Sequence, residues 1–154
     1  MVSERRAPAA IDLLGHPGHL ARRLQQASYQ LWNAVVSEEI TAPQFVVLNV
    51  LAAAPDIDQR TLGELSSLDR STTAEVVSRL DRRGLVERVR DDQDRRRNVL
   101  QLTPAGAATL AQLGAKTAVM NRMLLAPLSA EEQRVFLALM QRLVEAGERL
   151  RARS

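Results

Sequence analysis

The stretch from residue 62 to residue 103 constrains the fold more than any other part of this chain. It opens with a polar, hydroxyl-rich segment, which predicts a helix beginning near Asp69 or Ser71, because both residue types cap helices well. Two short strands are expected next, at 86–90 and 98–102, joined by a charged turn. A polar helix followed by a basic hairpin is typical of a winged helix-turn-helix, an arrangement suited to reading duplex DNA in two adjacent grooves.

Composition favours a mainly α fold with a small β-hairpin wing. The chain has 154 residues, enough for one domain with oligomerisation helices, and aromatic residues make up only 3% of it. A core of leucine, valine and alanine favours helices over a β-sandwich. Lys116 is the only lysine beside many arginines, which cluster at 79–97. Arginine suits bidentate contacts with phosphate and guanine, so this cluster indicates a nucleic-acid partner.

Several classes of function are excluded by what the chain lacks. Without cysteine it has no disulfide, thiolate metal site or thiol redox sensor. A metal site is not expected, because the two histidines, His16 and His19, are separated by Pro17-Gly18. No Gly-rich phosphate loop or hydrolase triad can be assembled, so we expect neither an enzyme nor a cofactor. The absence of a signal-like segment in residues 1–12 and of a long apolar run predicts a cytoplasmic protein without a membrane partner.

Capping and breaking residues divide the chain into segments. A helix is expected over 19–39, and a second one runs from the capping box at Thr41 and Gln44 to Ala54. A short strand is possible at 57–60, followed by a brief helix capped by Thr61. Beyond the hairpin we expect a helix from Thr103-Pro104 to Leu125 and a last helix from Ser129 to Arg151. We expect an N-terminal arm at 1–15 and a dimerisation and ligand-pocket helix at 16–40. The winged DNA-binding region is expected at 41–103 and the C-terminal dimerisation helices at 104–154.

The helix after Asp69 is the predicted recognition helix. Its apolar residues fall on one arc of a helical wheel, and its polar residues, Glu75 among them, fall on the opposite arc. Hydroxyls at its start can bond phosphate, helped by free N–H groups, and Arg79 is long enough to reach guanine O6 and N7. The residues expected to bind DNA from this helix are Ser71, Thr72, Thr73, Ser78, Arg79 and Arg82.

The hairpin tip supplies a second set of DNA-binding residues. Arg95, Arg96 and Arg97 stand at the tip, where a thin hairpin can carry arginine into a narrow minor groove. Asp94 is expected to orient one of them, Arg96, by an ion pair. A soluble turn of balanced charge is the plain alternative, since Asp91, Asp92 and Asp94 oppose the charge of these arginines.

The chain resembles the MarR (multiple antibiotic resistance regulator) family of transcription factors. The resemblance covers nearly all of 19–150 and is carried by Asp69-Arg70-Ser71-Thr72, Arg79-Leu80, Arg83-Gly84-Leu85-Val86, Asp94-Arg95-Arg96, Leu102-Thr103-Pro104-Ala105-Gly106 and Leu128-Ser129-Ala130-Glu131-Glu132. It implies an obligate homodimer through the N- and C-terminal helices, with recognition helices in successive major grooves of a palindromic operator. The apolar content of these helices, more than a small monomer can bury, agrees with a dimer. Most members repress, and many release DNA when a small aromatic anion binds.

The first helix resembles members that sense aromatic or phenolic carboxylates such as hydroxybenzoates and hydroxycinnamates. Such a pocket needs an arginine for the carboxylate, an aromatic wall and a group for a ring hydroxyl. Arg22 or Arg23 could bind the carboxylate, and Tyr29 or Trp32 could form the aromatic wall. The ring hydroxyl could be bound by His16, His19 or Ser28.

Other ligands and other partners of the winged helix are also compatible with the sequence. A related branch binds purine-derived anions such as urate through a first-helix tryptophan and the aspartate of the Asp-Arg-Ser-Thr motif, here Trp32 and Asp69. A regulator without a small ligand is a further alternative. A protein-binding winged helix is less favoured, because it needs no arginine at both tips. Nonspecific architectural binding is also less favoured, because it needs only cations and not a hydroxyl-rich helix.

Overall fold

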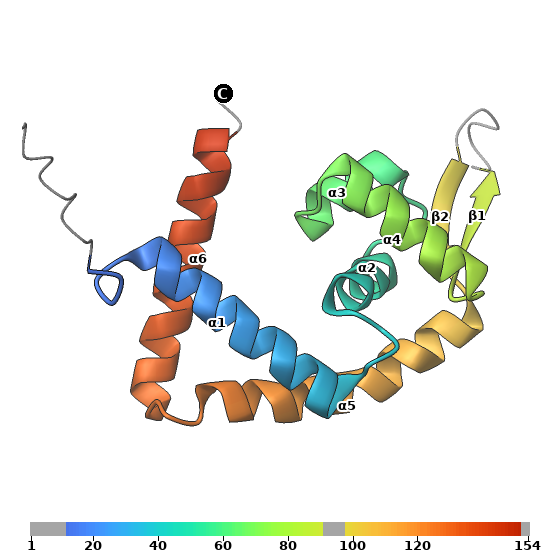
Figure 1. Cartoon of the computed structure of the whole chain (residues 1–154). Helices are drawn as coiled ribbons and strands as arrows, with labels where there is room; N and C mark the ends of the chain where they lie inside the picture. Colours follow the sequence, from blue (N-terminus) through green and yellow to red (C-terminus); the bar gives the residue numbers. More distant parts are fainter. Residues whose placement is uncertain (1–11, 91–97, 152–154) are drawn as a thin grey trace, which may run out of the picture.

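The computed structural model describes residues 12–90 and 98–151. Its elements, in chain order, are α1 (Pro17–Leu31), the π-helical turn η1 (Trp32–Val36), α2 (Ala42–Ala53), α3 (Gln59–Ser66), α4 (Arg70–Arg82), β1 (Val86–Arg90), β2 (Asn98–Leu102), α5 (Pro104–Leu125) and α6 (Ala130–Arg151). Helix α5 runs along the base of the molecule, with the winged part above its beginning and α6 rising from its end (Figure 1). The predicted mainly α fold with one small hairpin is confirmed.

The winged part is built around one apolar core. Leucines from α2, α3, α4 and β2 lie at its centre and are fully buried: Leu48, Leu62, Leu80 and Leu100. Helix α2 is in contact with α3, α4, β2 and α5, so it lies at the middle of this part. Burial of these side chains stabilises the fold, and it fixes which side of α4 faces outward.

The hairpin is an antiparallel pair whose register runs from Val86 opposite Leu102 to Arg90 opposite Asn98. The short strand expected at 57–60 is reduced to one bridge, in which Leu100 N donates to Ile57 O at 2.9 Å. Asp58, not Thr61, caps α3, since its side chain accepts from the Thr61 N–H at 2.8 Å. Because a cap at Asp58 starts the helix at once, only one extended residue remains to pair.

The helix starts follow their capping residues elsewhere. Thr41 and Gln44 form the expected capping box at α2, and Thr103 caps α5 by accepting from the Gly106 N–H at 3.0 Å. Ser129 and Glu132 bond reciprocally at the start of α6, and the bond from Ser129 N–H holds the pKa of Glu132 below its ordinary value. These three predicted boundaries are confirmed.

The first helix is shorter than expected. In place of one helix over 19–39, α1 ends at Leu31 and continues as a π-helical turn, closed by a bond from Ser37 N to Trp32 O at 3.1 Å. Ser37 is extended, and its hydroxyl accepts from the backbone N–H groups of Glu39 and Ile40. A serine that bonds the following backbone in this way competes with helical hydrogen bonding, which ends the helix there.

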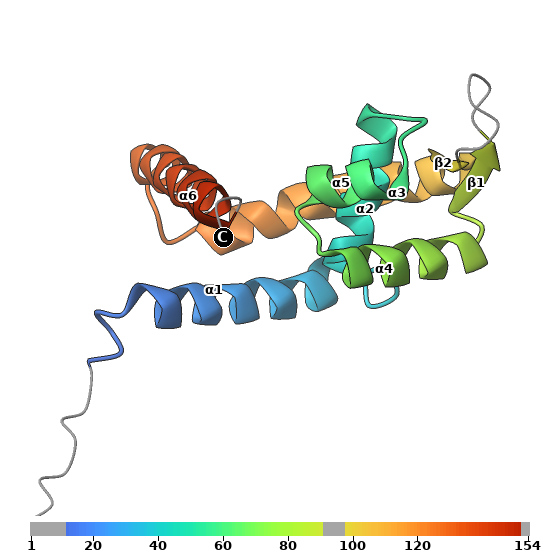
Figure 2. The same cartoon turned by 90° about the horizontal axis from the view of Figure 1, so that it is seen from above.

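Helix α6 stands largely apart from the rest of the subunit. None of residues 130–150 is buried, and even the apolar side chains of Leu139 and Leu143 are 48% and 72% exposed. Helices α1 and α6 cross in Figure 1, but the view from above shows them separated (Figure 2). Among the described residues, no helix combines the length and hydropathy that crossing a bilayer requires.

Candidate nucleic-acid interface

Helix α4 has one side in the core and one side in solvent. Val76, Val77 and Leu80 are buried against the neighbouring elements, while Ser78, Arg79 and Arg82 are exposed. The expected division of this helix into an apolar and a polar side is therefore observed. It leaves a row of polar side chains free to approach a partner.

Asp69 organises the first turn of α4. Its carboxylate accepts hydrogen bonds from Thr72 N at 2.8 Å and from the hydroxyls of Ser71 and Thr72, each at 2.7 Å. These donors, the Thr72 N–H foremost, hold the pKa of the Asp69 carboxyl far below its usual range. Each hydroxyl has one proton and gives it to Asp69, so both present oxygen lone pairs outward. Donation from these hydroxyls to phosphate, as expected from the sequence, requires them to leave Asp69.

Replacing Asp69 by asparagine should change how stability depends on pH. The folded-state pKa of Asp69 is lowered, so its ionised form contributes stability above the unfolded pKa of about 3.9, and that contribution is lost as pH falls. Asparagine caps a helix about as well but does not titrate. In thermal unfolding, the difference between the wild type and Asp69→Asn should be constant from about pH 5 to 8 and shrink below about pH 4. A difference independent of pH down to pH ~3 would contradict this role of the carboxylate.

Thr73 does not belong with the exposed residues of α4. Its side chain is 1% exposed, and its hydroxyl donates to Asp69 O at 2.7 Å. A Cβ on Gly63 would lie 3.0 Å from the Thr73 hydroxyl, which shows how closely α3 and α4 approach there. The prediction that Thr73 contacts DNA does not fit this position, and its role is to pack the two helices together.

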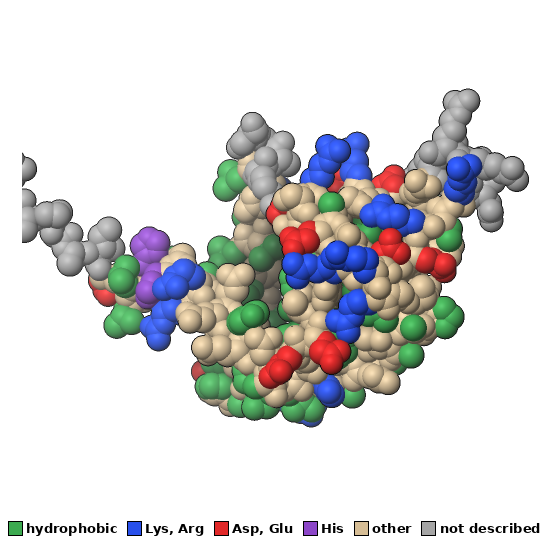
Figure 3. All heavy atoms as spheres, turned by 45° about the vertical axis from the view of Figure 1, so that its right-hand side comes forward, with side chains coloured by type: hydrophobic (Ala, Val, Ile, Leu, Met, Phe, Trp, Pro, Cys, Tyr) green, Lys and Arg blue, Asp and Glu red, His purple; other side chains and the backbone are tan. Residues whose placement is uncertain are grey.

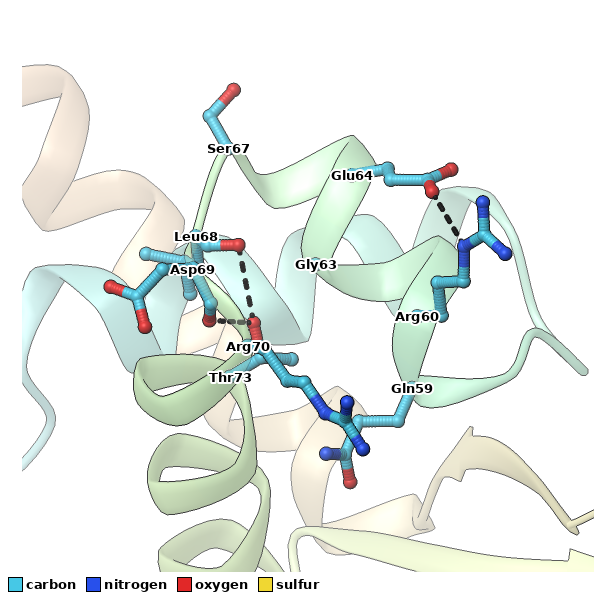
Figure 4. Close-up of a pocket in the computed structure, with 9 residues that line it drawn as sticks. All are labelled: Gln59, Arg60, Gly63, Glu64, Ser67, Leu68, Asp69, Arg70 and Thr73. Atoms are coloured by element: carbon cyan, nitrogen blue, oxygen red, sulfur yellow. Dashed lines mark hydrogen bonds and ion pairs between the residues drawn. The ribbon is translucent and has the colours of Figure 1, made fainter. Parts of the chain in front are cut away.

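A surface cavity of about 780 Å³ lies between α3 and the start of α4 (Figure 4). Arg60 and Arg70 line it together with Leu68 and Asp69. Arg60 is held by Glu64, with Nε and Oε1 3.0 Å apart. The cavity thus places polar and cationic side chains beside the first turn of the predicted recognition helix.

Carboxylates accompany many of the arginines on the winged part. Arg79 forms an ion pair with Glu75, four residues earlier on α4, and Arg83 contacts Glu39 at 3.1 Å. Figure 3 shows this side of the molecule, where arginine and carboxylate side chains lie next to one another. The surface is therefore of mixed charge and not uniformly basic.

The described part of the hairpin consists of the paired strands β1 and β2. The last paired residues are Arg90 and Asn98. Asp94, Arg95, Arg96 and Arg97, with the ion pair expected between Asp94 and Arg96, lie outside the described residues. Their assignment to DNA contacts stays a prediction.

The residues expected in a ligand pocket are spread around α1. Arg22 and Tyr29 are seven residues apart and share one exposed face, and Tyr29 is 62% exposed. His19, three residues before Arg22, lies within about 60° of it around the helix. Arg23 lies about 100° from Arg22, and Ser28 is only partly exposed. One exposed side of α1 therefore carries an arginine, an aromatic ring and a histidine, spread along more than two turns of the helix. A pocket from these residues needs a further element packed on α1.

The histidine His16 has a structural role. Its Nδ1 accepts from the backbone N–H of His19 at 3.2 Å and so caps α1. Among the residues the structure covers, no group of three or more histidine, aspartate or glutamate side chains is placed to hold a metal ion.

Trp32 packs inside the subunit. Its side chain is 4% exposed, its ring lies 5.3 Å from that of Phe45, and its Nε1 donates to Ile40 O at 2.6 Å. The expected use of Trp32 as an aromatic wall for a ligand does not fit this position. A tryptophan whose N–H reaches a backbone carbonyl is satisfied within the core.

Two contacts of the winged part were absent from the sequence-based site. Glu75 was expected on the polar side of this helix but not as the partner of Arg79, although their spacing of four residues signals an ion pair. The Ser67 hydroxyl donates to Glu148 Oε1 at 3.2 Å, which joins α6 to the turn before α4. No local pattern signals a contact between residues 81 positions apart in the chain.

An outward polar helix beside a short antiparallel hairpin is the architecture of a winged-helix DNA-binding protein. The model of the MarR family matches residues 40–97 of the chain. Transcriptional regulator HosA of Escherichia coli is 33% identical over 126 residues, which cover 82% of this chain and 93% of HosA. The chain belongs to the MarR family, whose members are transcriptional regulators and not enzymes.

Solved structures agree with this assignment. The PcaV transcriptional regulator of Streptomyces coelicolor, in complex with its natural ligand, is 59% identical with a TM-score of 0.86, covering 91% of this chain and 99% of PcaV. BpsR of Bordetella bronchiseptica, whose DNA binding is regulated by 6-hydroxynicotinic acid, is 26% identical with a TM-score of 0.76, covering 82% of this chain and 97% of BpsR.

Proposed function

We propose that this transcriptional regulator is a homodimer that binds a palindromic operator as a repressor and leaves it when a small aromatic carboxylate binds. The observation that carries the DNA part is the polar side of α4, which faces solvent beside the hairpin. The expected contacts are Ser71, Thr72, Ser78, Arg79 and Arg82 from α4, with Asp94, Arg95, Arg96 and Arg97 from the hairpin tip.

The dimer is supported by the apolar surface that the single subunit leaves open. On α6, large apolar side chains are about half exposed or more, including Leu137, Leu139, Leu143 and Val144. A helix with this much exposed apolar surface is stabilised by packing against a second helix of the same kind. We therefore assign dimerisation to residues 16–40 and 104–154, which flank the DNA-binding region 41–103.

An aromatic carboxylate is supported by the relatives and by the residues of α1. 6-Hydroxynicotinic acid, the regulator of BpsR, is an aromatic ring with one carboxylate and one hydroxyl. Arg22 or Arg23 would bind the carboxylate, and His19 or Ser28 the hydroxyl, with Tyr29 against the ring. Figure 3 shows hydrophobic side chains in a hollow beside the winged part.

The described residues at 12–90 and 98–151 do not favour the purine-anion alternative. That mode needs a tryptophan and the Asp69 carboxylate to face a ligand. Trp32 is buried, and Asp69 already accepts three hydrogen bonds from its own helix. A regulator without a small ligand is the remaining alternative, and it predicts that no aromatic acid releases the DNA.

The ligand proposal is tested by release of DNA from the purified protein. A labelled duplex bound by the protein is titrated with 4-hydroxybenzoate and 4-hydroxycinnamate, with 4-hydroxybenzamide as a control that lacks the carboxylate. We expect an acid to release the duplex and the amide to have no effect. Arg22→Ala and Arg23→Ala serve as controls for each other, because they lie on different faces of α1. One of them should weaken release by about tenfold while keeping DNA affinity. Release unchanged in both would place the pocket elsewhere.

Replacing Arg96 by alanine should weaken DNA binding and its dependence on salt. Each cation that neutralises a phosphate adds about 1 to the slope of log affinity against log salt. We expect Arg96→Ala to lower the magnitude of that slope by about 1 in a salt titration. Lys116→Ala, which removes one exposed charge from α5, should leave the slope unchanged. Equal slopes for the wild type and Arg96→Ala would remove this arginine from the contacts.

A further inference from the structure

The outer side of α4 carries an acid where a simple DNA-binding surface would carry none. Glu75 accepts a hydrogen bond from Arg79 Nη2, and their side chains are 62% and 53% exposed. Within the described part of the chain, no other side chain bonds either of them. The pair thus stands alone on the side of the helix that is proposed to face the major groove.

Stability does not account for this pair. An exposed ion pair four residues apart contributes only about 0.3–0.5 kcal/mol to a helix. A carboxylate facing a polyphosphate also repels it, so Glu75 weakens attraction to any DNA sequence. Its position is useful only if it gains a specific partner in the groove.

The charges of the whole helix support the same conclusion. From the cap to the last turn, three arginines (Arg70, Arg79 and Arg82) are matched by three carboxylates (Asp69, Glu75 and Asp81). The hydroxyl protons of Ser71 and Thr72 are also held by Asp69. This helix is therefore poorly suited to general phosphate binding and well suited to selecting hydrogen-bonding partners.

The base edges offer partners for both members of the pair. Guanine presents O6 and N7, which accept two N–H bonds from arginine, and cytosine presents an N4 amino group that donates to a carboxylate. Arg79 has five N–H donors and gives one to Glu75 Oε1, so its other donors and Glu75 Oε2 stay available.

We propose that Glu75 and Arg79 read sequence as one unit, with Arg79 binding the guanine and Glu75 binding the N4 amino group of the cytosine of one G·C pair in the half-site. Glu75 is at once a specificity-determining residue and the positioning residue for Arg79. The inference rests on the proposed placement of α4 in the major groove, and it names the base pair that this helix selects.

The test begins with selection of binding duplexes from a random-sequence library by the wild-type protein. A fixed G·C pair should appear at one position of each half-site. Changing that pair to A·T should weaken wild-type binding by about 10- to 100-fold. Fluorescence anisotropy then compares the selected, changed and random duplexes at one salt concentration.

Glu75→Gln should lose most of this discrimination and bind random duplexes several-fold more tightly. Glu145→Gln is the matched control, because Glu145 is also paired with an arginine four residues away, Arg149, but on α6. It should retain the wild-type discrimination. A merely structural role of Glu75 would change binding to all duplexes by the same factor, and that result overturns the inference.

The outcomes separate this inference from the function on which it rests. If the selected sequence is specific but has no fixed G·C pair, the proposal that Glu75 and Arg79 recognise this base pair is overturned. The protein would still be a sequence-specific DNA-binding regulator. Selection that enriches no sequence overturns both.

Discussion

Replacing Gly106 by alanine is expected to destabilise the protein by about 3 kcal/mol. An added Cβ would lie 2.0 Å from Leu85 O, 3.0 Å from Leu85 C and 3.1 Å from Leu102 Cδ2. The first two are backbone atoms, which cannot rotate away, so α5 would have to move off the turn that precedes the hairpin. Because Thr103 N also donates to Leu85 O at 3.2 Å, the same shift would loosen the link between α5 and the winged part.

The control for this prediction lies on the same helix. Gly114 is exposed, and a Cβ there would meet nothing within 4 Å. Gly114→Ala should leave the fold unchanged or stabilise it by up to about 1 kcal/mol, since alanine is the better helix former. Urea unfolding of both variants measures the difference. Equal stability of Gly106→Ala and Gly114→Ala would show that α5 does not pack as closely as the structure indicates.

Replacing Leu143 by glutamate should separate the proposed dimer and reduce operator affinity by 100-fold or more, on the order of the gain from linking two half-site contacts. Leu143 is 72% exposed in the single subunit and belongs to the apolar surface of α6. A charge there costs nothing in a monomer but must be buried in a dimer. Sedimentation equilibrium gives the oligomeric state, and anisotropy with a bound duplex gives the affinity.

The matched control adds the same charge to the same helix. Ala138 is exposed and lies on the polar side of α6, about 100° or more around the helix from the apolar residues named above, so Ala138→Glu should leave both the dimer and the DNA affinity unchanged. A Leu143→Glu protein that remains a dimer would contradict the assignment of this surface. Loss of the dimer in both variants would point to general repulsion and not to a buried Leu143.

Local signals in the sequence were sufficient to predict most of the fold. The ends of α2, α5 and the hairpin follow from capping boxes, prolines and a change from helical to alternating periodicity. One error occurs where two capping residues compete, and another where a serine ends a helix. Asp58 and Thr61 are both good caps, and the earlier one begins α3. Ser37 ends the first helix by bonding its neighbours, which periodicity alone does not register.

The residues of the candidate site are harder to predict from the sequence than the fold, because their exposure depends on tertiary contacts. Thr73 and Trp32 have polar atoms that suit a partner, yet both atoms are satisfied inside the subunit. Burial of this kind depends on how closely α3 and α4, or η1 and α2, approach. The polar side of α4 was predicted correctly as a surface, because one helix carries its own periodicity.

The most direct test of sequence-specific DNA binding is fluorescence anisotropy with a labelled duplex from the region upstream of the protein's own gene. A duplex of the same composition in scrambled order is the control, at one fixed salt concentration. We expect the upstream duplex to bind about 1,000-fold more tightly than the scrambled one, within the range of specific DNA-binding proteins. Equal affinity for the two duplexes, together with failure to select any sequence from a random library, would contradict the account.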